Sequence, residues 1–150
     1  MIGIVDYGMG NLFSVKNSLD YLGEDNIFCS HSDDLDRVDK IILPGVGAFP
    51  DCLRNLNKRG FINSLNYNVL QKKTPILGIC LGMQVMAKVS YEFEKTEGLG
   101  WINADVIRLS PINRDEKIPN IGWENIEYSN KTHLISGFNN KFMVIPKEMV

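Results

Sequence analysis

The sequence predicts an α/β fold: a doubly wound, mostly parallel sheet of three or four strands with a mixed or antiparallel extension. Short apolar runs that end in loops containing Gly and Pro alternate with stretches of helical period, which is typical of a parallel sheet covered on both faces. After residues 98–100 the pattern changes to partial alternation, which indicates the extension. No repeat, low-complexity tract or linker divides the chain, so we expect a single domain over residues 1–150.

The expected elements follow in chain order. Apolar runs predict strands at 2–5, 26–29, 41–43 and 75–79, and further strands within 101–109, 118–128 and 142–145. A first helix begins near Asn11, a residue suited to capping, and its apolar face carries Leu12, Val15, Leu19 and Leu22. A second helical stretch bends near Gly60 and carries Leu53, Leu56, Ile62, Leu65 and Val69. A third has helical spacing at Gly82, Val85, Met86 and Val89.

Composition excludes several classes of function. Hydrophobic residues make up 44% of the chain and charged residues 23%, a mixture typical of a soluble globular protein. Sixteen Lys and Arg against eighteen Asp and Glu give a net charge of −2, which argues against a nucleic-acid-binding surface. No apolar run approaches the roughly 20 residues of a membrane helix. Three cysteines without paired spacing indicate free thiols in a reducing compartment, so we expect a cytoplasmic protein. We also expect neither a metal nor a cofactor.

The loop after the strand at 75–79 has the pattern of a nucleophile elbow. Gly78-Ile79-Cys80-Leu81-Gly82 places a cysteine between two glycines at the junction of a strand and a helix. The turn forces Cys80 into a strained backbone conformation, and side chains at the glycine positions would collide with the neighbouring strand and helix. At a helix N-terminus the thiolate is favoured, and the Leu81 N–H is placed to bind an oxyanion. The alternative is a structural cysteine that behaves as a small hydrophobic residue.

Two further loops follow predicted strands. Pro44-Gly45-Val46-Gly47 is either a tight turn or a segment whose peptide flips to direct an N–H toward a substrate, and a cysteine elbow on another strand favours the second. Residues 8–13, Gly-Met-Gly-Asn-Leu-Phe, resemble the start of a dinucleotide fingerprint, but Phe13 stands at the third glycine position. A polar interface or a loop contact therefore explains this loop better.

Together the three loops resemble class I (triad) glutamine amidotransferases, above all the glutaminase subunits of imidazole glycerol phosphate synthases. The resemblance runs from Met1 to about Phe142 and implies the flavodoxin-like α/β fold of that family. The matching stretches are Ile4-Val5-Asp6-Tyr7-Gly8-Met9-Gly10-Asn11-Leu12, Leu43-Pro44-Gly45-Val46-Gly47-Ala48-Phe49, Pro75-Ile76-Leu77-Gly78-Ile79-Cys80-Leu81-Gly82-Met83-Gln84, Gly98-Leu99-Gly100 and Pro119-Asn120-Ile121-Gly122-Trp123.

The resemblance implies glutamine hydrolysis by a thiol. Cys80 corresponds to the nucleophile that attacks the side-chain amide and forms a glutamyl thioester. Val46 and Gly47 match the flipping oxyanion strand, and Leu81 supplies the second donor. The family binds glutamine at positions that correspond here to Gly45, Gln84 and Glu92.

The resemblance also implies a partner. The ammonia passes to a cyclase subunit of (β/α)8-barrel type in a heterodimer, which makes imidazole glycerol phosphate and AICAR in histidine biosynthesis. Asn11, Ser14 and Trp123 lie in segments that resemble the family's surface for that partner. A helix cap, an exposed polar residue and a core aromatic are the plain alternatives for these three side chains.

One part of the family pattern has no counterpart in this sequence. In the family, the catalytic base is a histidine in a Phe-His-Pro-Glu segment, with a glutamate two residues further on. This segment would follow the end of this sequence, and neither His31 nor His133 matches it. We expect both histidines on the surface. The tail also diverges after about Ile145, so we expect a domain that is incomplete at its C-terminus.

Three alternatives stay open at this point. The chain is an amidase-dead module that binds the synthase or glutamine, or it is a paralogue that feeds ammonia to a sugar in a surface-polysaccharide pathway. The third is a cysteine protein of another family on the same general fold, in which the stretches 7–12 and 44–47 would have no role.

Overall fold

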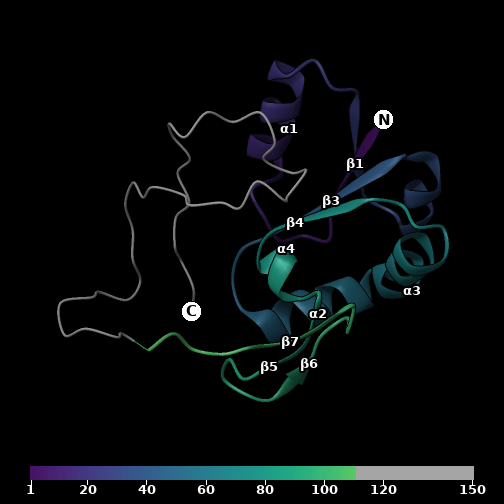
Figure 1. The fold of residues 1–150 in the computed structure, drawn as a ribbon. Helices are drawn as coiled ribbons and strands as arrows, with labels where there is room; N and C mark the ends of the chain where they lie inside the picture. The colour runs from purple at the N-terminus through teal and green to yellow at the C-terminus, as the bar shows by residue number, and fades with distance from the viewer. Residues whose placement is uncertain (111–150) are drawn as a thin grey trace, which may run out of the picture. The chain divides into compact units, whose positions relative to one another are not determined.

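The computed structural model describes residues 1–110, whose centre is a sheet of four parallel strands (Figure 1). These strands are β1 Ile2–Val5, β2 Asn26–Cys29, β3 Lys40–Gly45 and β4 Ile76–Cys80, in the spatial order β2-β1-β3-β4. The chain passes from β1 outward to β2 and then returns past β1 to β3. Because the order reverses there, the loops after β1 and β3 diverge at the carboxyl edge, where open α/β sheets bind ligands.

Helices cover both faces of this sheet, as the sequence predicts. They are α1 Leu12–Tyr21, α2 Phe49–Lys58, α3 Phe61–Asn66 and α4 Leu81–Gln84. Successive strand residues point to opposite faces. Ile4 and Ile42 pack with Leu19 of α1, whereas Val5 and Leu43 belong to the larger core formed with the other three helices. Figure 1 shows α1 on one side of the sheet and α2, α3 and α4 on the other.

Local capping explains where the helices begin and end. The Asn11 side chain accepts a hydrogen bond of 3.2 Å from the Ser14 N–H, which confirms the predicted start of α1. The predicted bend near Gly60 is also confirmed: its φ of +74° ends α2 and directs the chain into α3. The apolar face of α1 was predicted one residue too long, because Leu22 caps the helix and is exposed.

A second, smaller sheet corrects the helix predicted through Val89. Its strands are β5 Ala87–Ser90, β6 Thr96–Glu97 and β7 Ile102–Val106; β6 is antiparallel to β5, and β7 is parallel to it. Val89 therefore lies in β5, and α4 ends at Gln84. The carbonyls of residues 85–88 accept hydrogen bonds from the N–H groups of residues 98–102, so sheet pairing takes the acceptors that a longer helix would use. This mixed sheet confirms the predicted extension; the strands predicted within 118–128 and 142–145 lie outside the described residues.

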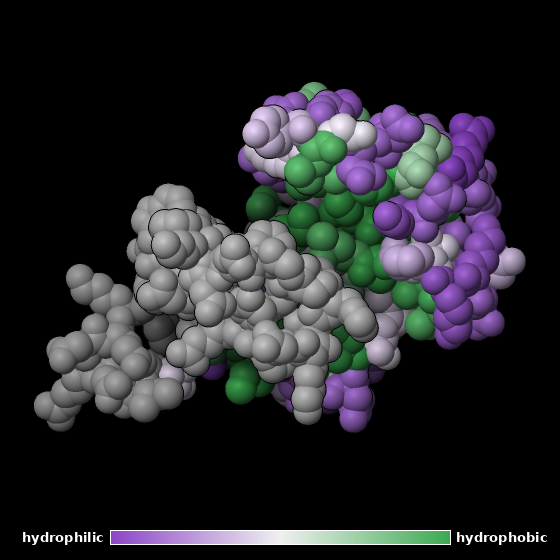
Figure 2. Space-filling view, turned by 45° about the horizontal axis from the view of Figure 1, so that its top comes forward, coloured by the Kyte–Doolittle hydropathy of each residue, from purple (hydrophilic) through white to green (hydrophobic). Residues whose placement is uncertain are grey.

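Strand β4 is more exposed than predicted. Leu77 is 44% and Ile79 38% exposed, because within residues 1–110 β4 pairs only with β3. Ile79 borders a shallow apolar hollow beside Leu19 and Ile42. Figure 2 shows green apolar surface bordered by purple hydrophilic residues on the face that it draws. Among the described residues, no helix has the length and apolar character needed to cross a membrane.

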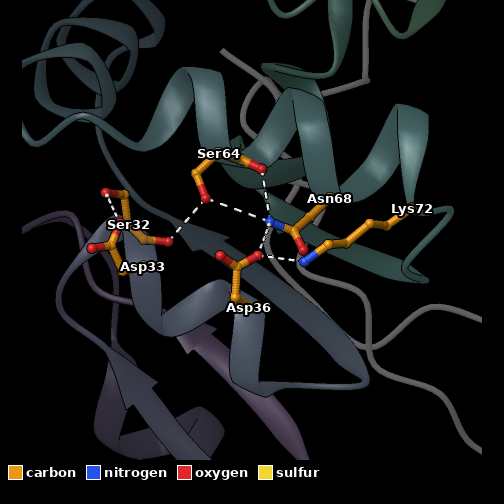
Figure 3. A network of polar contacts seen from close by, with 6 residues as sticks. All are labelled: Ser32, Asp33, Asp36, Ser64, Asn68 and Lys72. Atoms are coloured by element: carbon orange, nitrogen blue, oxygen red, sulfur yellow. Dashed lines mark hydrogen bonds and ion pairs between the residues drawn. The ribbon is translucent and has the colours of Figure 1, made fainter.

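A polar network joins the 3-10 turn Ser32–Arg37 to α3 and to the helical turn that follows it, Tyr67–Gln71 (Figure 3). Asn68 is 1% exposed, and its amide nitrogen donates to the Ser64 carbonyl at 3.0 Å and lies 3.5 Å from the Asp36 carboxylate. The Ser64 hydroxyl donates to the Ser32 carbonyl at 2.9 Å. Lys72 closes the network by pairing with Asp36 at the surface. Asn68 is therefore the buried centre of this connection.

Substitutions at Asn68 and Lys72 compare what the buried hydrogen bonds and the exposed ion pair contribute to stability. Asn68→Ala removes the donor to Ser64 and Asp36, so we expect the free energy of unfolding to fall by about 1 to 3 kcal/mol. Lys72→Met removes the surface ion pair and the contact of the ammonium with the exposed Tyr67 ring, and we expect a loss of at most about 1 kcal/mol. Urea unfolding of both variants measures the difference, and equal losses would contradict this assignment.

Candidate active site

Cys80 stands at a sharp turn between β4 and α4. Its backbone has φ 54° and ψ −118°, a conformation that residues other than glycine rarely adopt. Such strain costs on the order of 1–3 kcal/mol and is concentrated at functional sites. The turn leaves the Cys80 thiol exposed. The predicted elbow geometry is therefore present in the structure.

The two glycines that flank Cys80 are required by packing. A Cβ atom on Gly82 would lie 1.8 Å from the Leu43 carbonyl oxygen, and one on Gly78 would lie 2.5 Å from the Met83 Cα. Both neighbours are backbone atoms, which cannot swing away as a side chain could. Side chains at these two positions would therefore collide with the adjacent strand and helix, as the sequence predicts.

The three cysteines differ in environment. Cys29 and Cys52 are buried, and burial raises the pKa of each thiol to about 11. Cys80 is the exposed one. Helix α4 is a single turn of four residues, so the long-helix dipole expected at Cys80 is absent and only the N–H groups of that turn remain. The Leu81 N–H, predicted as an oxyanion donor, is the first of these.

The predicted oxyanion loop lies directly beside the elbow. In the register of β3 and β4, Gly45 pairs with Cys80. A Cβ on Gly45 would lie 2.9 Å from the Gly82 nitrogen, so the strand end packs against the start of α4. Val46 is 54% exposed and Gly47 has φ +103°. The structure thus brings Gly45, Val46, Gly47 and Cys80 together at one edge of the sheet.

The side chain of Glu92, a predicted glutamine-binding residue, also lies next to this loop. Its carboxylate accepts a hydrogen bond of 2.8 Å from the Phe49 N–H, the first residue of α2. The residue before α2, Ala48, has no side chain that could cap a helix, and Glu92 takes that role from the loop after β5. Gln84 is half-buried at the end of α4, one turn beyond Cys80.

Tyr7 is a site residue that the sequence reasoning left without a role of its own. It is fully buried, and its hydroxyl donates to the Pro44 carbonyl at 2.9 Å. Gly8 and Gly10 have positive φ, and Gly10 lies against Pro44. The loop after β1 is therefore packed on the end of β3. A tyrosine two residues after a strand, at the carboxyl edge of the sheet, was the signal for this contact.

The remaining predicted residues are farther away. Asn11 and Ser14 are exposed at the start of α1, where Asn11 is a helix cap. His31 is exposed, as predicted, and follows β2, so β1 and β3 separate it from β4. With strands about 4.8 Å apart, β2 and β4 are roughly 14 Å from one another. His31 is therefore not placed to exchange a proton with Cys80. Trp123 and His133 lie outside the described residues.

The exposure of Cys80 predicts selective alkylation. At neutral pH iodoacetamide should modify Cys80 in the folded protein, because Cys29 and Cys52 are buried and their raised pKa values leave them as thiols. Peptide mass mapping should find one modified cysteine in the native chain and all three after denaturation. Equal modification of Cys29 or Cys52 in the native protein would contradict the structure.

The packing at Gly82 predicts a large loss of stability on substitution. Gly82→Ala forces a Cβ into the Leu43 carbonyl, and we expect the free energy of unfolding to fall by about 3 kcal/mol or more. Gly60→Ala is the control, because nothing lies within 4 Å and only its positive φ is strained. That strain should cost about 1 to 2 kcal/mol. Denaturant unfolding compares the two, and similar losses would argue against the close contact.

Comparison with known proteins points to one family. The family described as "Glutamine amidotransferase class-I" matches residues 3–148. Imidazole glycerol phosphate synthase subunit HisH 1 of Campylobacter jejuni (strain 81-176) is 42% identical over 141 residues, which cover 94% of this chain and 70% of that protein. The HisH subunit of Caldanaerobacter subterraneus is 43% identical, with 93% and 67% covered. That of Geobacillus thermodenitrificans is 38% identical, with 99% and 74% covered.

A solved structure agrees on the fold. A crystal structure of a glutamine amidotransferase superposes on this chain with a TM-score of 0.66 at 19% identity, over 83% of this chain and 62% of that one. The four-stranded parallel sheet and the small mixed sheet are thus the architecture of such an enzyme. The match over residues 3–148 and the identities of about 40% show that this chain belongs to the class I glutamine amidotransferase family and is similar to its HisH subunits.

Proposed function

We propose that the chain is a glutaminase subunit that hydrolyses glutamine to glutamate and ammonia. The observation that carries this proposal is the exposed Cys80 at a strained elbow. Cys80 pairs in register with Gly45, the first residue of the glycine loop (Gly45–Gly47, the predicted oxyanion loop). The Cys80 thiolate attacks the side-chain amide carbon of glutamine and forms a tetrahedral intermediate. The proton that the thiol gave up goes to the amide nitrogen, the carbon–nitrogen bond breaks and ammonia leaves. Water then hydrolyses the resulting glutamyl thioester to glutamate and restores the thiol.

The proposal assigns the oxyanion to backbone donors. The carbonyl oxygen gains negative charge as the sulfur attacks, and N–H groups aimed at that position lower the barrier. The Leu81 N–H is one donor, supported by its place as the first residue of α4. A flipped peptide between Val46 and Gly47 supplies the other. The exposure of Val46 and the positive φ of Gly47 support a segment that can rotate.

Glutamine binding is assigned to Gly45, Gln84 and Glu92. Glu92 contacts the first N–H of α2, directly after the glycine loop, so its carboxylate lies at the edge of the site. A carboxylate there suits the ammonium group of a free amino acid. Gln84, one turn beyond Cys80, offers an amide that can donate and accept.

The proposed partner is the cyclase subunit of imidazole glycerol phosphate synthase. Support comes from the relatives, which are named as HisH subunits of that enzyme and share about 40% identity with this chain. The cyclase, a (β/α)8 barrel, consumes the ammonia in making imidazole glycerol phosphate and AICAR for histidine biosynthesis. Asn11 and Ser14, exposed at the start of α1, are the proposed contact residues within the described part of the chain.

A second candidate function is a binding module without amidase activity. It is favoured by the position of His31, which two strands separate from Cys80. A thiol amidase uses a base to take the thiol proton and return it to the leaving ammonia. In this candidate the chain binds the cyclase, or glutamine, without turnover.

Ammonia release in the presence of the cyclase separates the two candidates. The chain is mixed with the cyclase subunit from the same organism and its nucleotide substrate, and ammonia is measured with added glutamine. If the chain is a glutaminase, ammonia release rises well above background, and Cys80→Ala lowers it by at least about 10³-fold. Cys29→Ala is the matched control and should retain activity, because Cys29 lies in β2. No ammonia with intact cyclase binding would support the binding module.

A further inference from the structure

We propose that Tyr7 is a positioning residue of this site, whose hydroxyl holds the Pro44 carbonyl and so sets the start of the oxyanion loop, Gly45–Gly47, against Cys80. This inference rests on the proposed glutaminase function. Tyr7 touches no reacting atom in this proposal. It acts through the main chain of Pro44 and Gly45.

The first support is the geometry around the hydroxyl. Tyr7 follows β1 and is 0% exposed, and its oxygen lies 2.9 Å from the Pro44 carbonyl oxygen. The same oxygen would lie 2.7 Å from a Cβ on Gly45, so it packs directly on the next residue too. Gly45 is the residue that pairs with Cys80 across β3 and β4. One buried hydroxyl therefore contacts both residues at the base of the loop.

The second support is a donor chain behind the hydroxyl. The Cys52 thiol of α2, also 0% exposed, donates to the Tyr7 oxygen at 3.2 Å, and Tyr7 donates onward to Pro44. Burial raises the pKa of Tyr7 well above its ordinary value, and the negative charges that Cys52 and Cys80 would carry raise it further. The hydroxyl therefore stays protonated and keeps its hydrogen on the carbonyl side.

The third support is the contrast between the two ends of the loop. Pro44 and Gly45 are buried, whereas Val46 and Gly47 are exposed. A peptide that flips needs a fixed point before it, because otherwise the rotation spreads along the strand and the N–H misses the oxyanion. A misplacement of about 1 Å in a catalytic group can lower the rate by about 100-fold. The Tyr7 hydroxyl provides that fixed point.

Tyr7→Phe tests the proposal because it removes only the hydroxyl. With the cyclase present, we expect kcat for glutamine hydrolysis to fall by about 10- to 100-fold, with a much smaller change in KM. Alkylation of Cys80 by iodoacetamide should stay within about twofold of the wild-type rate. In that reaction the sulfur forms a bond to the methylene carbon, iodide leaves, and no oxyanion develops. A purely structural role of Tyr7 would disturb the elbow itself and change the alkylation rate by more than about twofold in either direction, and that result would overturn the proposal.

Two further variants serve as controls. Tyr67→Phe makes the same chemical change at a tyrosine that is 54% exposed, and both reactions should be unchanged. Cys52→Ala removes the donor that orients the Tyr7 hydroxyl and so weakens the bond to Pro44 without removing it. We therefore expect kcat to fall, but less than in Tyr7→Phe. If Tyr7→Phe fails to fold, Cys52→Ala alone decides. A loss of turnover with normal alkylation supports the proposal, and unchanged turnover or a parallel loss of both overturns it.

Amide hydrogen exchange tests Tyr7 without any turnover. In Tyr7→Phe, the N–H groups of residues 45–49 should exchange at least several-fold faster, whereas those of α1 should not change. Unchanged exchange at 45–49 overturns the positioning role. If the wild-type chain releases no ammonia with the cyclase, the proposed function fails. The exchange result then still decides whether Tyr7 holds the loop.

Discussion

The close contact between Gly82 and the Leu43 carbonyl is the constraint on which the candidate site depends. The 1.8 Å that would separate a Gly82 Cβ from that oxygen means that the backbones of α4 and β3 touch with no side chain between them. This contact places the start of α4 over the end of β3, and strand pairing sets Gly45 beside Cys80. Cys80 and the glycine loop are distant in the sequence but therefore lie at the same edge of the sheet.

Much of this arrangement could be predicted from residue patterns. Short apolar runs predicted β1 and β2 to the residue and β3 and β4 to within two residues, and glycines at fixed spacing around Cys80 predicted the elbow. Both signals are local, because the conformational demand and the residue that meets it are neighbours. The prediction failed at Val89, where helical spacing gave way to pairing between β5 and β7. That pairing joins Ala87 to Ile102 and Val89 to Asp105, which are too far apart in sequence for a local periodicity to predict.

The contacts that hold the site together were also not predictable, for the same reason. The Tyr7 hydroxyl meets Pro44 across 37 residues, and the Glu92 carboxylate meets the Phe49 N–H across 43. The Glu92 contact satisfies a backbone group that the local sequence leaves without a partner, the first N–H of α2 after Ala48. Buried main-chain groups need partners, but only the tertiary structure decides which side chain supplies them.

The backbone angle at Cys80 also restricts which nucleophiles the elbow can accept during evolution. Left-handed φ values are tolerated poorly by β-branched side chains, because two heavy atoms on Cβ then crowd the adjacent backbone. With φ at 54°, serine can replace cysteine without new steric conflict, whereas threonine cannot. A hydroxyl nucleophile can therefore replace the thiol at this position only as serine, and not as threonine. The geometry of one residue limits the chemistry that descendants of this scaffold can reach.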